Sequence, residues 1–83
     1  MLFEATFKPS KEMKYNEDAL KLANTKIALY QGWIVKEGPF KGQQCYYVPN
    51  SNVGWIPVSD LTELRPISTV QWQDLHKSCG FAV

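Results

Sequence analysis

Glycine and proline residues break the middle of this chain into short runs of strand-forming residues. Trp33-Ile34-Val35 is followed by the turn Gly38-Pro39-Phe40-Lys41-Gly42, and Gly54-Trp55-Ile56-Pro57 leads into Ser59-Asp60-Leu61. Proline restricts φ and glycine permits positive φ, so these residues favour tight turns between strands. Closely spaced short strands of this kind predict a mainly β fold, specifically a small five-stranded barrel.

The chain has 83 residues, the size of one domain. Hydrophobic residues make up 45% and aromatic residues 13% of it, enough material for the interior of a small barrel. Nine Lys and Arg residues stand against eight acidic residues. This balance neither drives nor forbids binding to nucleic acid, for which a dedicated protein usually carries a basic face.

Alternation of apolar and polar residues predicts where the strands lie. Residues 2–7 alternate and stop before Pro9, which cannot donate to a sheet. Residues 25–30 alternate again, and residues 33–35 either continue that strand or begin another. Further strands are expected over residues 43–48, 53–58 and 62–64, the first two joined by a hairpin loop at residues 49–52.

Residues 17–23 have the features of both a short helix and a strand. Asn16 suits a helix N-cap, and Glu17 and Lys21 have the spacing of an i,i+4 ion pair. Leu20 and Leu22, however, alternate with polar or small neighbours as in a strand. We expect a short helix here and keep the strand as the alternative.

A C-terminal helix is expected over residues 69–78. Ser68 and Gln71 have the spacing of a capping box. Trp72, Leu75 and Cys79 fall on one helical face. That face must pack either on the barrel or on a partner.

The chain is accordingly divided into a barrel over residues 1–66 and a C-terminal helix with its tail over residues 67–83. Trp72 and Leu75 are the candidate contact residues if the helix faces another protein or a second copy of the chain. The edge strands of the sheet also make a homodimer plausible.

The two cysteines, Cys45 and Cys79, do not form a disulfide framework of the kind found in small secreted domains. Cys45 lies in an apolar run and is expected to be a buried thiol, although a bridge to Cys79 stays open. No secretory signal and no apolar run of about 20 residues is found, so no contact with membrane is expected. These features favour a cytoplasmic protein.

The stretch from Trp33 to Gln43 resembles the KOW motif of ribosomal proteins and transcription elongation factors, a hydrophobic strand followed by a Gly-Pro-Phe-x-Gly turn. In that family the motif lies on a small barrel that contacts RNA or another protein. Lys36 and Lys41, together with the backbone amides around Gly38 and Gly42, would then meet phosphate groups.

Residues 3–64 also resemble SH3 domains. Ala5-Thr6-Phe7-Lys8-Pro9 is similar to the opening Ala-Leu-Tyr strand of that family, and Gly54-Trp55-Ile56-Pro57 matches its Gly-x-[Ile/Phe]-Pro signature. The resemblance implies an SH3-like barrel. The peptide groove of the family uses an Asn and a Tyr just after this proline, where the present chain has Ser59 and Asp60.

Five aromatic residues are the candidate partner-binding surface: Trp33, Phe40, Tyr46, Tyr47 and Trp55. Most are expected to pack in the core. Adjacent residues of a strand point to opposite faces, so either Tyr46 or Tyr47 should reach the outer face. An exposed ring beside Trp33 or Trp55 would suit a protein partner or a nucleic-acid base.

The chain shows no catalytic constellation and no cofactor motif, so an enzyme is not expected. His76 and Cys79 alone are too few for a metal site. The sequence therefore predicts a non-catalytic adaptor or regulatory domain that binds a protein partner. Two alternatives remain: a KOW-type nucleic-acid or ribonucleoprotein binder, and an obligate oligomer with activity at a symmetry axis.

Overall fold

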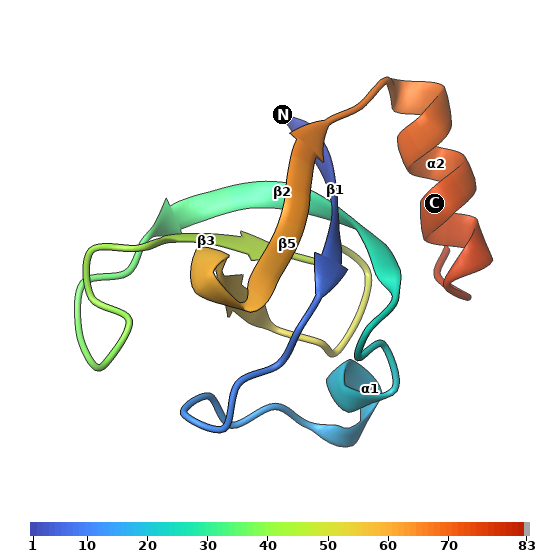
Figure 1. Ribbon diagram of the computed structural model, residues 1–83. Coiled ribbons are helices and arrows are strands. Elements are labelled where there is room, and N and C mark those ends of the chain that lie inside the picture. The colour runs from blue at the N-terminus through green and yellow to red at the C-terminus, as the bar shows by residue number, and fades with distance from the viewer. Residues whose placement is uncertain (83) are drawn as a thin grey trace.

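In residues 1–82, which the computed structural model describes, five antiparallel strands form a sheet in the order β4-β3-β2-β1-β5 (Figure 1). The strands are β1 (Leu2–Phe7), β2 (Lys26–Ile34), β3 (Gln44–Tyr47), β4 (Trp55–Pro57) and β5 (Leu61–Pro66). The helices are α1 (Glu17–Leu20), the 3-10 turn η1 (Val58–Asp60) and α2 (Thr69–Ser78). The prediction of a mainly β fold with a C-terminal helix is confirmed.

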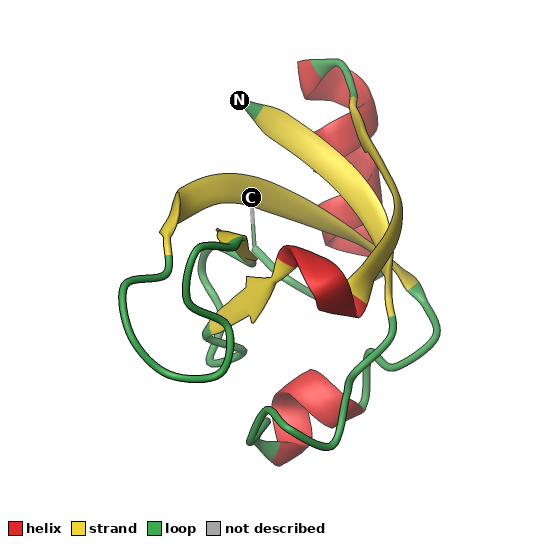
Figure 2. Cartoon of the chain, turned by 60° about the vertical axis from the view of Figure 1, so that its left-hand side comes forward, coloured by secondary structure: helices red, strands yellow, loops and turns green. Residues whose placement is uncertain are grey.

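The sheet curls, and its two edge strands, β4 and β5, are connected by only the three residues of η1 (Figures 1 and 2). One register shift lies between Glu4 and Thr6, where β1 pairs with β5. A second lies between Gln31 and Ile34, where β2 pairs with β3. Because such bulges bend a strand and increase its twist, they help the sheet to curl around its own core.

Strand β2 runs through Gly32 without interruption and ends at Ile34, so Trp33 and Ile34 continue the strand that begins near residue 25. A Cβ atom at Gly32 would lie 3.0 Å from Cys45 Sγ and 3.1 Å from the Cys45 carbonyl oxygen. Gly32 therefore allows β2 and β3 to approach closely at the bulge.

The segment after the first strand forms the helix α1, which answers the question that the sequence left open. The Asn16 side chain accepts a hydrogen bond of 2.8 Å from the Ala19 backbone N–H, as expected of an N-cap. Ala19 is buried and Leu22 packs against the core, whereas Leu20 is exposed. The strand alternative is wrong, because the residues that reach the core are spaced for a helical turn.

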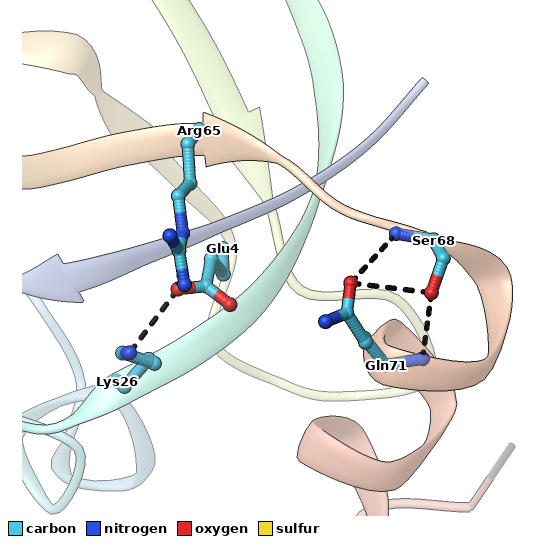
Figure 3. A network of polar contacts seen from close by, with 5 residues as sticks. All are labelled: Glu4, Lys26, Arg65, Ser68 and Gln71. Atoms are coloured by element: carbon cyan, nitrogen blue, oxygen red, sulfur yellow. Dashed lines mark hydrogen bonds and ion pairs between the residues drawn. The ribbon is translucent and has the colours of Figure 1, made fainter.

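Helix α2 covers the predicted range, residues 69–78, and starts with the predicted capping box. The Ser68 hydroxyl accepts a hydrogen bond of 3.2 Å from the Gln71 backbone N–H (Figure 3). The Gln71 side-chain oxygen in turn accepts a bond of 3.2 Å from the Ser68 backbone N–H. Two otherwise unsatisfied amide groups at the helix start are thereby paired.

The Trp72 face of α2 packs on the chain's own sheet. Trp72 is 4% exposed, and its indole N–H donates a 3.0 Å hydrogen bond to the carbonyl oxygen of Leu29 in β2. Its ring stacks on Tyr30 with the centroids 5.0 Å apart, and Leu75 is half-buried. Trp72 is thus not available to a partner in this conformation, because its apolar surface and its polar N–H are both satisfied within the chain.

The main core lies inside the curled sheet and receives buried side chains from all five strands. These residues are Ala5 and Phe7 of β1, Ile27 and Leu29 of β2, Tyr46 of β3, Ile56 of β4 and Leu61 of β5. A second cluster joins Val35, Phe40 and Cys45. Neither α1 nor α2 in residues 1–82 has the length and hydropathy needed to cross a bilayer.

The two cysteines are free thiols in different parts of the molecule. Cys45 belongs to the second cluster and is buried, as predicted. Cys79 is half-buried against the main core, where burial raises the pKa of its thiol. The disulfide alternative is therefore not realised in this structure.

Candidate binding groove

A groove of about 730 Å³ lies on the face of β2, β3 and β4 that points away from the core. Tyr30, Tyr47 and Trp55 form its floor, since they alternate along their strands with the buried residues Leu29, Tyr46 and Ile56. Trp33, near the end of β2, is 52% exposed and forms one wall. The remaining lining residues are Gln31, Gly32, Val48, Pro49, Asn50, Ser51 and Gly54.

The four rings support one another across the strands. Tyr47 is the direct register partner of both Tyr30 and Trp55. The Tyr30 and Tyr47 rings meet edge to face with centroids 5.6 Å apart. Trp33 lies 6.5 Å from both Tyr47 and Trp55, at interplanar angles of 30° and 58°. Cross-strand aromatic pairs of this kind stabilise a sheet and hold the rings in place.

Among residues 1–82, no charged side chain lines the groove, although a fifth of the sequence is charged. Its three amide and hydroxyl side chains, Gln31, Asn50 and Ser51, all have partners within the chain. The Ser51 hydroxyl donates a 2.6 Å hydrogen bond to the Val48 carbonyl oxygen, and the Gln31 amide donates one of 3.3 Å to the Gln44 side chain. The surface presented to solvent is therefore aromatic and neutral.

Only three of the five aromatic residues expected at the partner surface reach the groove, namely Trp33, Tyr47 and Trp55. Phe40 is 8% exposed and supports Trp55 from the second cluster, with ring centroids 6.4 Å apart. Tyr46 is 7% exposed and meets Phe3 edge to face in the core. The pKa of the Tyr46 hydroxyl is raised mainly by burial and to a smaller extent by the electrostatic effect of the neighbouring Cys45. These two rings belong to the interior because their strand and turn positions point inward.

Tyr30 is the groove residue that sequence reasoning missed. Residues 25–30 alternate, and this alternation places Ile27 and Leu29 on one face of the strand. Tyr30 therefore belongs to the opposite face, the same outer face that either Tyr46 or Tyr47 had to occupy. The alternation of inward and outward side chains along the two strands could have shown that Tyr30 lies on the outer face. The pairing of β2 with β3 was needed to bring the rings together.

The glycine turn is an ordered loop beside the groove, but its lysines do not line it. Gly38 and Gly42 have φ values of 86° and 89°, as the turn composition predicted. The Gly42 N–H donates a 2.8 Å hydrogen bond to the Val35 carbonyl oxygen, which closes the loop. Lys36 and Lys41 are exposed on this loop.

Asp60 is a buried carboxylate whose role in the structure was not predicted. It accepts hydrogen bonds of 3.1 and 3.0 Å from the Ser10 amide and hydroxyl and one of 2.6 Å from the Tyr15 hydroxyl. Burial, together with the hydrogen bond to Asp60 and its charge, raises the pKa of Tyr15. Asp60 is thus an internal anchor for residues 10–15.

Glu4 is a second buried carboxylate, on the outer face of β1 (Figure 3). It lies 3.1 Å from the Lys26 ammonium and 2.9 Å from Nε of Arg65. Burial acts to raise the pKa of Glu4, but hydrogen bonds and charge interactions with Lys26 and Arg65 bring it below its usual value of 4.5. Within residues 1–82, no cluster of three or more His, Cys, Asp or Glu side chains is placed to hold a metal ion.

Comparison with protein-family models, with curated proteins and with solved structures finds no match.

Proposed function

We propose that this chain is a non-catalytic adaptor or regulatory module, built as an SH3-like barrel, that binds a protein partner through the aromatic groove. The observation that carries the proposal is the exposure of Trp33, at 52%, beside Tyr47 and Trp55 in a concave, uncharged surface. Trp and Tyr are the residues that most often dominate binding energy at protein interfaces. The barrel is supported by the curl of the sheet and by the short η1 connection between its edge strands.

The groove suits binding because its rings need little further ordering. Tyr30, Tyr47 and Trp55 stand on neighbouring strands and contact one another or Trp33. The buried Phe40 ring packs edge to face against the Trp55 ring. A side chain that is already held in place loses less conformational entropy when a partner binds. Affinity then comes from apolar area and shape rather than from charge.

The partner segment that fits this surface is uncharged and apolar. A charged side chain entering the groove would lose hydration without meeting an opposite charge on the part of the chain that the structure describes, where every lining residue is uncharged. A nucleic-acid backbone would likewise find no cation in the groove. We therefore expect an uncharged protein segment to bind with an affinity that changes little between low and moderate salt.

Random-peptide display against the immobilised 83-residue chain, followed by NMR titration of the enriched peptides, tests this function. We expect peptides with apolar, uncharged anchors that shift the side-chain resonances of Trp33, Tyr47 and Trp55. Trp33→Ala should weaken binding at least tenfold. Leu20→Ala is the matched control, because Leu20 is similarly exposed, on α1, but does not line the groove. Enriched peptides that bind Trp33→Ala normally, or no enrichment at all, would contradict the proposal.

The KOW-type alternative makes a different prediction for the same NMR experiment. Titration with generic single- and double-stranded RNA and DNA would shift residues 36–47, through Lys36 and Lys41, and the shifts would vanish as salt rises. That outcome would replace the protein-binding proposal. An obligate oligomer would instead show unfolding that depends on protein concentration.

A further inference from the structure

His76 is a buried histidine with no hydrogen-bond partner for either ring nitrogen within residues 1–82. It is 1% exposed and lies in a stack of rings. The Trp72 ring lies 4.6 Å away on one side and the Phe81 ring 5.1 Å away on the other, at angles of 25° and 26°. The tail after α2 thus covers a polar ring that has only apolar surfaces against its faces.

The neutral imidazole is the form that this environment favours. Burial lowers the pKa of His76, against the opposing effect of the nearby carbonyl groups of Ala82 and Pro49, which do not reach hydrogen-bond geometry. The ring faces and the C-terminal end of α2 also favour a cation. These effects are smaller than the cost of burying a charged ring whose N–H groups have no acceptor.

Charged neighbours do not compensate for a charge on His76. The titratable side chains on α2, on the elements packed against it and beside Phe81 come from five places. They are Asp74 and Lys77 of α2, Cys79 just after it, Glu4 of β1, Lys26 and Tyr30 of β2, and Asp18 and Lys21 in or next to α1. Within residues 1–82 none of them forms an ion pair or a hydrogen bond with the imidazole. Glu4 and Lys26 are already paired with each other.

We propose that the end of α2 and residues 79–82 form a pH-sensitive latch on the sheet, which opens when His76 takes up a proton. In the closed latch the stack runs from Phe81 through His76 and Trp72 to Tyr30. Opening exposes the imidazole to water, where both of its N–H groups find acceptors. Protonation therefore favours the open latch.

The latch also contacts the groove directly. Tyr30 stacks on Trp72 on one side and meets Tyr47 on the other. The side-chain amide of Asn50, another lining residue, donates a 3.4 Å hydrogen bond to the Ala82 carbonyl oxygen. An open latch removes the support behind Tyr30 and releases Asn50. Only the effect of latch opening on peptide binding rests on the proposed function. The latch itself opens and closes without any ligand.

NMR of the full chain between pH 7.5 and pH 5.0 tests the latch. The chain has one histidine, so the imidazole ring resonances belong to His76 and follow its protonation directly. The indole N–H of Trp72, bonded to Leu29, reports on docking of α2. Relative to neutral pH, we expect the ratio of open to closed latch to rise about tenfold by pH 5.5, one unit below the ordinary pKa of 6.5. Amide exchange in α2, once corrected for the intrinsic effect of pH on exchange, should accelerate by the same factor.

His76→Phe is the control variant, since it keeps a flat ring in the stack and cannot take up a proton. Its α2 exchange rates, corrected for the intrinsic effect of pH, should be constant over this range. Equal acceleration in the wild type and His76→Phe would overturn the latch, as would a wild-type imidazole that titrates at or above 6.5 while the Trp72 indole stays protected. The wild-type measurement decides the matter even if the variant does not fold. Loss of peptide binding by Trp33→Ala tests the groove separately.

Discussion

The Tyr15 hydroxyl donates a 2.6 Å hydrogen bond to the buried carboxylate of Asp60, 45 residues later in the chain. Ser10 donates two more bonds to the same oxygen, so a single carboxylate in η1 holds the loop between β1 and α1. Tyr15 also packs edge to face on Phe7, with ring centroids 4.9 Å apart. The loop is thus tied to the end of the sheet at both a polar and an apolar contact.

Removing the Tyr15 hydroxyl should destabilise the fold without changing its shape. Tyr15→Phe takes one donor from a buried carboxylate, which should lower the free energy of unfolding by about 1.5–3 kcal/mol. Asp60→Ala should cost at least as much, because three donors then lose their acceptor. Urea unfolding followed by circular dichroism measures both. An unchanged urea midpoint for Tyr15→Phe would show that this bond contributes nothing.

Gly32→Ala tests the close approach of β2 to β3. The added Cβ would lie 3.0 Å from Cys45 Sγ and 3.1 Å from the Cys45 carbonyl oxygen, so both the side chain and the backbone of Cys45 must move away slightly. We expect a loss of about 1–3 kcal/mol, the usual cost of overpacking. Gly38→Ala is the comparison, since open space surrounds its added Cβ and only its positive φ is strained. Thermal unfolding should rank Gly32→Ala as the less stable variant.

Stability should fall in acid partly through Glu4. Its pKa is lower in the folded chain than its usual value of 4.5, so its contribution is fully present above that value. The contribution is lost as the pH falls through the folded pKa, because the unfolded chain then binds the proton more readily. Glu4→Gln should flatten this part of the stability curve between about pH 5 and pH 3. If both proteins lose stability in parallel over that range, Glu4 is not the group responsible.

Trp33 and Tyr46 should respond oppositely to truncation, although both were candidates for the same surface. Trp33→Ala removes a half-exposed ring and should change the free energy of unfolding by less than about 1 kcal/mol. Tyr46→Ala leaves a cavity in the core and should cost about 3–5 kcal/mol, the range for large aromatic residues. Chemical denaturation separates the two cases. A large loss for Trp33→Ala would contradict this prediction and show that the ring contributes mainly to the stability of the fold.

Ser68→Ala should weaken the start of α2. The Ser68 hydroxyl accepts a bond from the Gln71 N–H, and its loss should cost about 1 kcal/mol. Amide exchange should rise most in the first turn of α2 and much less in β1 and β2. Ser78→Ala serves as the control, because the Ser78 hydroxyl bonds only to the Asp74 carbonyl within the same helix. Uniform acceleration across the sheet would contradict a local capping role.

Local sequence signals determined most of the secondary structure. Alternation located β1, the Asn16 cap located α1, and the Ser68–Gln71 spacing located α2, because each depends on residues within a few positions of one another. The same alternation placed one of Tyr46 and Tyr47 on each face. Glycine composition correctly predicted positive φ at Gly38 and Gly42.

Pairing between distant strands decided the rest. The groove exists because the register places Tyr47 opposite both Tyr30 and Trp55, and no local pattern contains that register. Asp60 became an anchor, and His76 a buried ring, through contacts with residues far away or past the end of the helix. Sequence periodicity treats both as polar surface residues, because their burial depends on distant contacts: hydrogen bonds from Ser10 and Tyr15 for Asp60, and stacked rings for His76.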